Sequence, residues 1–398
     1  MKTDKTIVKK KFIFLLSHPI QYFSPLFQLM AKEPDIDLLV LYCSDENVKG
    51  HIDKGFGVEV KWDIPLLDGY NYKFLKNNSW KPSIFNGFFG LINFEIFKVL
   101  KKEKGSFLVI HSWSYLTNFL AILAGKLNGV KLCLRTENPL NQELLKSKII
   151  LFLRKIFFRY FWFKLFNYFF YIGTQNRKLY EYYGVKKEKL VFTPYAVDNS
   201  RFRAEYEMYK DKKPELRKEL GLPVDKTIIL FSGKYIPKKR PMDLMQAYYS
   251  LKDEKAALVF LGDGELRKEM EDYIRMHILK DVYLTGFKNQ SEVGKYFAAT
   301  DIFVLPSGPG ETWGLVVNEA MNFGLPIIIS KIIGCSDDLV KNSENGFVFN
   351  CNDIDGLSNY IFHLINDELL QTDFGIKSLE IIFKYSFKNI IYNLKMIN

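Results

Sequence analysis

The sequence predicts an α/β protein with two doubly wound domains, each a parallel sheet covered by helices on both faces. Two observations predict this class. Apolar runs of strand length alternate with helix-length amphipathic stretches, as in parallel sheets, and the alternation occurs in both halves of the chain. The length of 398 residues suits two or three domains, and the apolar content of 48% suits large cores.

The first half contains five apolar runs of strand length. They are Phe12–Leu16, Leu38–Tyr42, Phe107–Ile110, Lys131–Arg135 and Phe169–Ile172. Helical patterns lie between several of them, notably over Pro25–Lys32 and Leu116–Leu127. These elements predict a first domain over residues 1–196.

The second half repeats the theme with six strand-length runs. They are Thr227–Ser232, Ala257–Leu261, Val282–Thr285, Ile302–Leu305, Pro326–Ser330 and Gly346–Phe349. Helical patterns over Arg240–Lys252 and Glu265–His277 separate the earlier runs. We predict a second domain over residues 197–372, joined to the first near Pro194–Asp198. Doubly wound sheets bind ligands at the carboxyl ends of their strands, so the loops there are the candidate sites.

The net charge of +11 is concentrated in the first half. Residues 1–200 hold 30 Lys and Arg against 17 Asp and Glu, a balance of +13, so the remainder holds 26 against 28, or −2. Within the first half, Leu144–Tyr180 contains eight basic residues and no acid. Such an asymmetry indicates an anionic partner for the first domain: a membrane surface, lipid phosphates or nucleic acid.

The cysteines and the apolar runs indicate where in the cell the protein is expected. The cysteines, at positions 43, 133, 335 and 351, form no CxxC pair, so we expect a reducing cytoplasm and no thiolate metal site. The basic N-terminus imitates a signal peptide, but its apolar core is too short and ends at His18-Pro19. No apolar run approaches the roughly 18 to 20 residues that span a bilayer, so we expect no integral membrane segment.

The most informative segment is PSGPGETWGLVVNEAMN, from Pro306 to Asn322. It follows a strand pattern and opens a helix, with Glu311 and Glu319 eight positions apart and Gly314 between them. The second carboxylate would lie two turns along the helix, on nearly the same face as the first. Unpaired N–H groups at the helix start suit an anion. Carboxylates for hydroxyl groups beside a phosphate cradle suit a nucleotide sugar, although the pair alone is more typical of a solvated helix start.

Two further loops follow strands of the second half. Gly233 and Lys234 end the first strand, and Lys239 lies in the same loop, so two cations can neutralise a departing diphosphate. After the next strand, Gly262 and Gly264 permit a tight turn around Asp263. Singly, each of these signals also fits a solvated loop. Their order, each at a strand's carboxyl end, makes a nucleotide-sugar site the better interpretation.

This arrangement resembles the C-terminal domain of the GT4 family of retaining glycosyltransferases, densely over residues 225–372. SHPIQYFSPLF (17–27), WDIPLLDGY (62–70) and RTEN (135–138) resemble one subgroup of that family. The resemblance implies a GT-B fold, with two Rossmann-like domains facing a cleft. It also implies a C-terminal helix, within residues 373–398, that packs back on the first domain.

The resemblance also implies roles for residues of the second domain. Glu311 would contact the donor sugar, Glu319 the ribose hydroxyls, and Lys234 with Lys239 the diphosphate. Many family members have arginine at the first cation, and lysine lacks its bidentate fork. The backbone amides of Trp313, Gly314 and Leu315 would face the donor.

Histidines and an Arg–Glu pair follow strands of the first half. His18 can hydrogen-bond the diphosphate or the acceptor hydroxyl, or it can be a packing residue beside Pro19. His111 occupies a position where the resemblance places a histidine near the reacting sugar. Arg135 and Glu137 can bind the acceptor or pair with each other.

The stretch KSKIILFLRKIFFRYFWFKLFNYFF, residues 146–170, mixes cations with aromatic residues as interfacial helices do. It predicts peripheral contact with an anionic membrane. The alternative is a helix buried against the first sheet whose lysines extend to solvent.

Two Asp-x-Asp pairs, at 35–37 and 353–355, are interpreted as turns or helix caps. The GT-B resemblance also implies no essential metal, so we expect neither a metal nor another cofactor.

The leading hypothesis is a retaining glycosyltransferase that moves a sugar from a nucleotide-diphospho-sugar to a saccharide or lipid-linked acceptor in polysaccharide or lipopolysaccharide synthesis. One alternative keeps the fold but epimerises or hydrolyses nucleotide sugars. Another, from a different class, is a nucleic-acid-binding protein that uses the basic first half, although this leaves the second half without a role.

Overall fold

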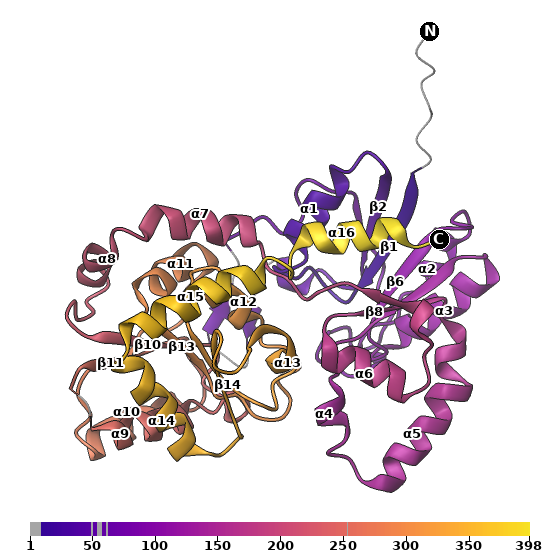
Figure 1. The fold of residues 1–398 in the computed structure, drawn as a ribbon. Coiled ribbons are helices and arrows are strands. Elements are labelled where there is room, and N and C mark those ends of the chain that lie inside the picture. Colours follow the sequence, from indigo (N-terminus) through magenta and orange to yellow (C-terminus); the bar gives the residue numbers. More distant parts are fainter. Residues whose placement is uncertain (1–8, 49–50, 54–57, 61–62, 253) are drawn as a thin grey trace.

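The computed structural model describes residues 9–48, 51–53, 58–60, 63–252 and 254–398. It contains two parallel sheets in separate domains (Figure 1), which confirms the predicted doubly wound class. The first sheet has the strand order β5-β2-β1-β6-β7-β8-β9, and the second has the order β12-β11-β10-β13-β14-β15. A short antiparallel pair, β3 (His51–Asp53) and β4 (Val58–Val60), stands apart from both sheets.

The seven strands of the first sheet reproduce the five predicted runs and add two edge strands. In chain order they are β1 (Lys10–Leu16), β2 (Ile36–Tyr42), β5 (Tyr72–Phe74), β6 (Phe107–His111), β7 (Lys131–Arg135), β8 (Tyr168–Tyr171) and β9 (Leu190–Phe192). The edge strands β5 and β9 have three residues each, too few to give an apolar pattern.

Successive residues of β1 enter different cores, which shows why its sequence is apolar throughout. Ile13 and Leu15 belong to one hydrophobic cluster, and Phe12, Phe14 and Leu16 belong to another on the opposite face. Strands buried on both faces are near-continuous apolar runs. The helices of this domain are α1 (Ser24–Ala31), α2 (Ile96–Leu100), α3 (Leu116–Leu127), α4 (Leu140–Glu143), α5 (Lys148–Tyr160) and α6 (Thr174–Tyr182).

All six strands of the second sheet were predicted, within a residue at most of their ends. They are β10 (Thr227–Ser232), β11 (Ala256–Leu261), β12 (Val282–Leu284), β13 (Ile302–Leu305), β14 (Ile327–Ser330) and β15 (Gly346–Phe349). The helices are α7 (Asn199–Tyr209), α8 (Lys213–Glu219), α9 (Pro241–Leu251), α10 (Arg267–Met276), α11 (Gln290–Ala299), α12 (Leu315–Met321), α13 (Ser336–Leu339), α14 (Ile354–Ile365) and α15 (Glu368–Ile382).

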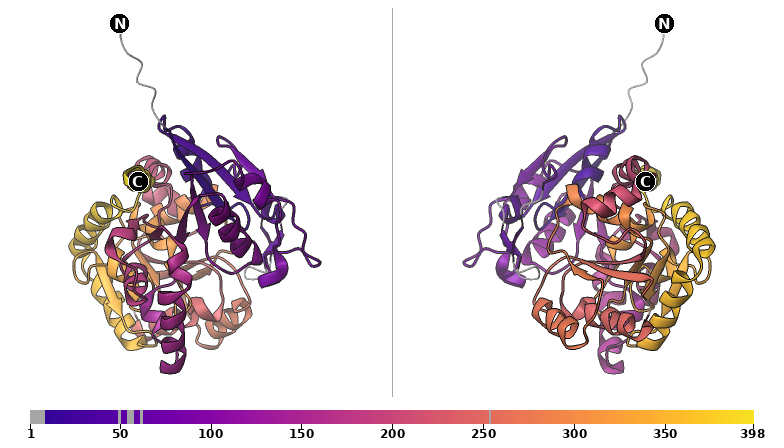
Figure 2. Two further views of the ribbon diagram at one scale, coloured as in Figure 1. Left: turned by 90° about the vertical axis from the view of Figure 1, so that its right-hand side faces the viewer. Right: turned by 90° about the vertical axis from the view of Figure 1, so that its left-hand side faces the viewer.

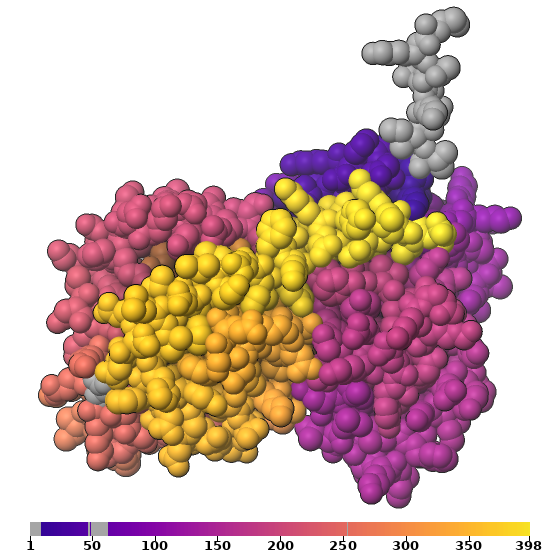
Figure 3. Space-filling view, in the orientation of Figure 1, coloured from indigo at the N-terminus to yellow at the C-terminus, as the bar shows by residue number. Residues whose placement is uncertain are grey.

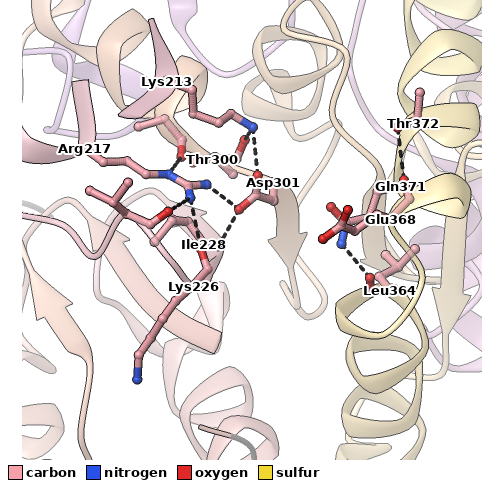
Figure 4. A network of polar contacts seen from close by, with 12 residues as sticks. Lys213, Arg217, Lys226, Ile228, Thr300, Asp301, Leu364, Glu368, Gln371 and Thr372 are labelled. Atoms are coloured by element: carbon pink, nitrogen blue, oxygen red, sulfur yellow. Dashed lines mark hydrogen bonds and ion pairs between the residues drawn. The ribbon is translucent and has the colours of Figure 1, made fainter. Parts of the chain in front are cut away.

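A buried arginine connects α8 to the second sheet at the amino ends of its strands (Figure 4). Arg217 is 6% exposed and donates to the carbonyl oxygens of Ala299 and Lys226, each at 3.0 Å, and to the carboxylate of Asp301 at 2.5 Å. Asp301 also accepts from Lys213 and from the Ile228 amide. The charge of Arg217 is thus matched at the start of β13.

The last helix, α16 (Phe387–Met396), leaves the second domain and lies on the first (Figure 3). Its buried residues, among them Ile390 and Leu394, join the core beside β1 and α1. Lys395 pairs with Asp35 at 2.7 Å, and Asn393 donates to the Phe192 carbonyl oxygen at 2.9 Å. Within residues 373–398, positions 373–382 belong to α15 on the second domain, so α16 alone makes this crossing.

Candidate functional site

The glycine loops after β10 and β11 are interlocked at adjacent strand ends. Gly262 has φ +147°, and a Cβ there would lie 2.0 Å from the Gly233 carbonyl oxygen, so no larger residue fits. The Gly233 amide donates to the Leu261 carbonyl oxygen at 2.9 Å, and the Tyr235 amide to that of Asp263 at 2.8 Å. Gly264, also at positive φ, completes the second turn. The two loops therefore pack directly against each other at the carboxyl ends of β10 and β11, which only glycine at position 262 allows.

An ion pair joins two of the predicted site residues. Lys239 ends the short 3-10 turn Pro237–Lys239 before α9, and its Nζ pairs with Oε2 of Glu311, which follows β13. The side chains are 15% and 10% exposed, respectively. Lys234, half-buried, lies in the same loop as Lys239. A cation and a carboxylate thus lie side by side at the ends of neighbouring strands.

Glu319 lies among residues that sequence reasoning did not select. It is 4% exposed within α12, and burial raises the pKa of its carboxyl group to about 7, although the Arg201 charge lowers it. Tyr22 of the first domain and Gln290 at the start of α11 also face this carboxyl group. Its surroundings therefore differ from those of Glu311, and the shared helix face expected from spacing does not give them common partners.

Tyr22, Arg201 and Gln290 line a cavity of about 140 Å³ between the domains. Arg201 holds Gln290 by donating to its carbonyl oxygen at 3.0 Å and to its side-chain oxygen at 2.6 Å. Only one signal pointed to this group: Tyr22 lies inside the SHPIQYFSPLF motif. The other two approach Glu319 because α7 packs against α11.

Trp313 serves the interface between the domains. Its side chain is 1% exposed, and its ring contacts Gly173, where a Cβ would lie 2.3 Å from it. Its Nε1 donates to Asn318 at 2.9 Å. Gly314, at φ +90°, starts α12, and Leu315 is the first helical residue. The side chain of Trp313 is therefore occupied by packing between the domains and does not face solvent.

The first domain contributes a neutral histidine beside a buried arginine. His111 and Arg135 are paired in register at the ends of β6 and β7. Burial, and secondarily the Arg135 charge, holds the pKa of His111 well below its ordinary value. Its Nε2 is buried and has no hydrogen-bond partner among the described residues. In a neutral imidazole, an unpaired Nε2 can form one hydrogen bond with a hydroxyl group, as donor or as acceptor according to the tautomer.

Arg135 is 4% exposed and lies between two aromatic rings, with its guanidinium carbon 5.0 Å from the Phe23 ring centre and 4.9 Å from that of Tyr195. The Arg135–Glu137 pair considered from the sequence exists as a long contact of 3.9 Å. His18 follows β1, the strand next to β6, and its Nδ1 lies 2.9 Å from the Ser17 hydroxyl oxygen.

The domains meet through loops at the carboxyl ends of their strands. Thr174, at the start of α6, donates to Asp338 of α13 through its amide at 2.8 Å and its hydroxyl at 2.7 Å, and these helices lie side by side (Figure 1). Gln142 of α4 contacts the backbone of Glu311. Nothing in the sequence pattern marked Gln142, because an interdomain contact has no periodicity.

The described residues contain no group of three or more His, Cys, Asp or Glu side chains arranged around a possible metal ion. As predicted, Asp353 caps a helix, accepting from the Gly356 amide at 2.9 Å.

Within the basic stretch 146–170, α5 projects from the first domain (Figure 2). Phe158 is its only buried residue. Ile149 is 73% exposed, Phe152 63% and Leu153 60%. The alternative of a helix buried against the first sheet is therefore wrong for α5, whereas Trp162, Phe163 and Phe169, later in the stretch, are buried in the core of the first domain. Among the described residues, no helix has both the length and the apolar character to cross a bilayer.

Comparison with known proteins agrees with this geometry. Residues 212–380 match the family described as glycosyl transferases group 1. The chain is 28% identical over 293 residues to the UDP-Gal:alpha-D-GlcNAc-diphosphoundecaprenol alpha-1,3-galactosyltransferase of Escherichia coli, a match that covers 69% of this chain and 70% of that protein. It is 26% identical over 279 residues, 69% of each chain, to a Campylobacter jejuni alpha-1,4-N-acetyl-D-galactosaminyltransferase named for a diphosphoundecaprenol-linked (PP-undecaprenol) saccharide.

The crystal structure of Anabaena HepE in complex with UDP-glucose has the same fold, with a TM-score of 0.69 and 16% identity over 97% of this chain and 98% of that one. The predicted GT-B architecture is thus confirmed. The sequence matches and the shared fold lead to one conclusion: the protein is a glycosyltransferase with the GT-B fold, and its residues 212–380 match the glycosyl transferases group 1.

Proposed function

We propose that the protein transfers a sugar, with retention of configuration, from a UDP-sugar to a lipid-linked saccharide at the cytoplasmic face of the membrane. The observation that carries the donor site is the Lys239–Glu311 pair, beside the interlocked glycine loops of β10 and β11. The uridine base is proposed because HepE binds UDP-glucose and the Escherichia coli relative is named for UDP-Gal.

In this proposal the diphosphate lies beside the glycine loops of Gly233 and Gly262, at the carboxyl ends of β10 and β11. Lys234 and Lys239 offset its charge as the bond between the anomeric carbon and the diphosphate oxygen breaks. These side chains supply the positive charge, so we propose that the reaction needs no metal. Glu311, released from Lys239 by the incoming diphosphate, accepts hydrogen bonds from the donor sugar.

The first domain binds the acceptor and presents the acceptor's hydroxyl group. Its oxygen bonds to the anomeric carbon on the face that the diphosphate leaves, and its proton passes to the departing phosphate oxygen. The neutral imidazole of His111 can bind a sugar hydroxyl without adding charge. Glu319, in the second domain, accepts hydrogen bonds from the ribose hydroxyl groups. His18, at the neighbouring strand end, completes the acceptor side.

Charge and exposed apolar area support a membrane-bound acceptor. The exposed residues of α5 include the apolar Phe152 and Leu153 and the basic Lys148 and Arg159. Interfacial helices combine apolar burial with attraction to anionic lipid, about 1 kcal/mol for each basic residue near the surface. We therefore propose that α5 docks on the anionic inner leaflet.

Aromatic contacts extend this surface beyond α5. Trp80 and Phe85, which are 70% and 57% exposed, lie in the loop before α2. Ring contacts connect this loop to α5 through the sequence Trp80, Phe89, Phe88, Phe119, Trp162 and Phe157, with centroid separations of 4.8–6.1 Å. Loop and helix are thus connected through the buried Trp162, and the exposed rings at both ends of this connection are of the kind that suits a membrane interface.

The donor proposal is tested by Glu311→Ala. We expect UDP to bind as in the wild type, while sugar transfer to an undecaprenyl-diphosphate-linked saccharide falls at least 100-fold. Unchanged transfer would contradict the assignment. Product analysis without acceptor separates transfer from the remaining alternative, since an epimerase or hydrolase would convert the UDP-sugar on its own.

The membrane proposal is tested by co-sedimentation with phosphatidylglycerol and phosphatidylcholine vesicles. Phe152→Ser combined with Leu153→Ser should abolish binding to the anionic vesicles. Leu369→Ser, which removes an apolar side chain that is 81% exposed on the second domain, is the matched control. Equal binding to both lipids, or loss in the control alone, would refute the role of α5.

A further inference from the structure

Gln142 reaches from the first domain to the loop that carries Glu311. It lies in α4, which follows β7, and its carboxamide uses both its nitrogen and its oxygen. The Nε2 donates to the Glu311 carbonyl oxygen at 2.9 Å and to that of Ile332 at 3.0 Å. The Oε1 accepts from the Gly310 amide at 3.0 Å. One side chain therefore holds the backbone on both sides of the Gly310–Glu311 peptide bond.

The loop that Gln142 holds is a tight turn. Gly310 has φ +98°, and the Glu311 amide donates to the Gly308 carbonyl oxygen at 3.3 Å. The second domain contributes a contact of its own, from the Gly334 amide to the Glu311 carbonyl oxygen at 3.2 Å. With its backbone held from both domains, Glu311 directs its side chain to Lys239.

Helix α4 is firmly supported, so it can impose this position. The amide of the neighbouring Asn141 donates to the side-chain oxygen of Gln175 in α6 at 3.1 Å. Glu143, 3% exposed, accepts from the Tyr183 hydroxyl at 2.6 Å and pairs with Arg154 at 2.6 Å. A short helix fixed on both sides of Gln142 keeps its carboxamide in place.

We propose that Gln142 is a positioning residue for donor-sugar recognition. It sets the Glu311 loop in its sugar-binding position only while the domains are in contact, so the sugar is recognised in the closed enzyme. This inference rests on the proposed function, in which Glu311 binds the donor sugar. It predicts that Gln142 affects the affinity for the sugar but not for the nucleoside diphosphate, which other loops hold.

The test measures dissociation constants for UDP, UDP-galactose and UDP-glucose by titration calorimetry. Gln142→Met keeps the side-chain length but removes both hydrogen-bonding functions. We expect it to weaken binding of the preferred UDP-sugar about 10-fold, the effect of roughly 1.4 kcal/mol of lost hydrogen bonding, while UDP binding changes less than twofold. Lys178→Met, which removes an interdomain contact of 3.1 Å to Asp337 away from Glu311, should leave the ratio of the two constants unchanged.

A second variant, Gln142→Glu, separates positioning from bulk packing. Its carboxylate can accept from the Gly310 amide but cannot donate to Glu311. Sugar affinity relative to wild type should therefore be reduced at pH 7.5 and should recover below about pH 5, where a protonated carboxyl group can donate.

Suppose that the wild type transfers sugar. Equal losses of affinity for UDP and UDP-sugar in Gln142→Met, or no loss of affinity for either, would then overturn the role of Gln142. A wild type that binds none of the three nucleotides would instead overturn the proposed donor, and this inference with it. Thermal unfolding of each variant confirms that the fold is retained.

Discussion

Glu319→Gln gives the sharpest test of the buried carboxyl group between the domains. Burial raises the pKa of Glu319 from 4.5 to about 7. The folded protein therefore holds a proton that the unfolded chain has already released in this pH range. Stability from this group is fully present below about pH 4.5, is lost as the pH rises toward 7, and stays lost above it.

The magnitude follows from the size of the shift. A difference of about 2.5 pKa units, at 1.36 kcal/mol for each, corresponds to about 3 kcal/mol. Glutamine does not titrate, so the stability of Glu319→Gln relative to wild type should increase by up to this amount between pH 5 and pH 8. Other titrating groups contribute equally to both proteins and cancel in the difference.

Urea unfolding of ligand-free protein at pH 5, 6, 7 and 8 measures this difference. Glu319→Met is a useful second variant. Its unfolding free energy at any one pH differs from that of Glu319→Gln because the side chain packs differently, but its difference from wild type must change with pH in the same way. A difference in unfolding free energy that stays constant from pH 5 to pH 8 would refute the reasoning. So would a difference that changes in the opposite direction.

Three further predictions concern stability and metal dependence. Arg217→Met should lower the free energy of unfolding in urea by about 3 kcal/mol, because it leaves the partly buried Asp301 charge without its main partner. Lys213 is more exposed, so Lys213→Met should lower it by under about 1 kcal/mol. Equal effects of the two substitutions would contradict the network. Gly173→Ala should lower the free energy of unfolding by about 1–3 kcal/mol, measured by thermal unfolding, because its Cβ would lie 2.3 Å from the Trp313 ring. An unchanged melting temperature would contradict this prediction. Sugar transfer should survive treatment with EDTA, and activity restored only by added Mg²⁺ or Mn²⁺ would contradict the metal-free proposal.

Local patterns predicted the sheets because parallel strands buried on both faces have continuous apolar sequences. β1 and β10 show this plainly, whereas β5 and β9 escaped prediction because three-residue edge strands carry too little pattern. Glycine and charge placement at strand ends predicted that Lys239 and Glu311 belong to the same region. Their pairing needed the strand order, since β10 and β13 are neighbours in the sheet but about 70 residues apart in the chain.

The sequence by itself determined the two α/β domains, the glycines and charges at the strand ends of the second domain and the basic character of the first half, since these depend on local periodicity and on residue type. Only the tertiary structure decided which side chains meet across the domains. It brought Tyr22 to Glu319 and Gln142 to Glu311, it buried Trp313 against Gly173, and it left the apolar face of α5 exposed. Such contacts depend on how two separately folded surfaces pack, and surface packing leaves no repeating pattern along the chain.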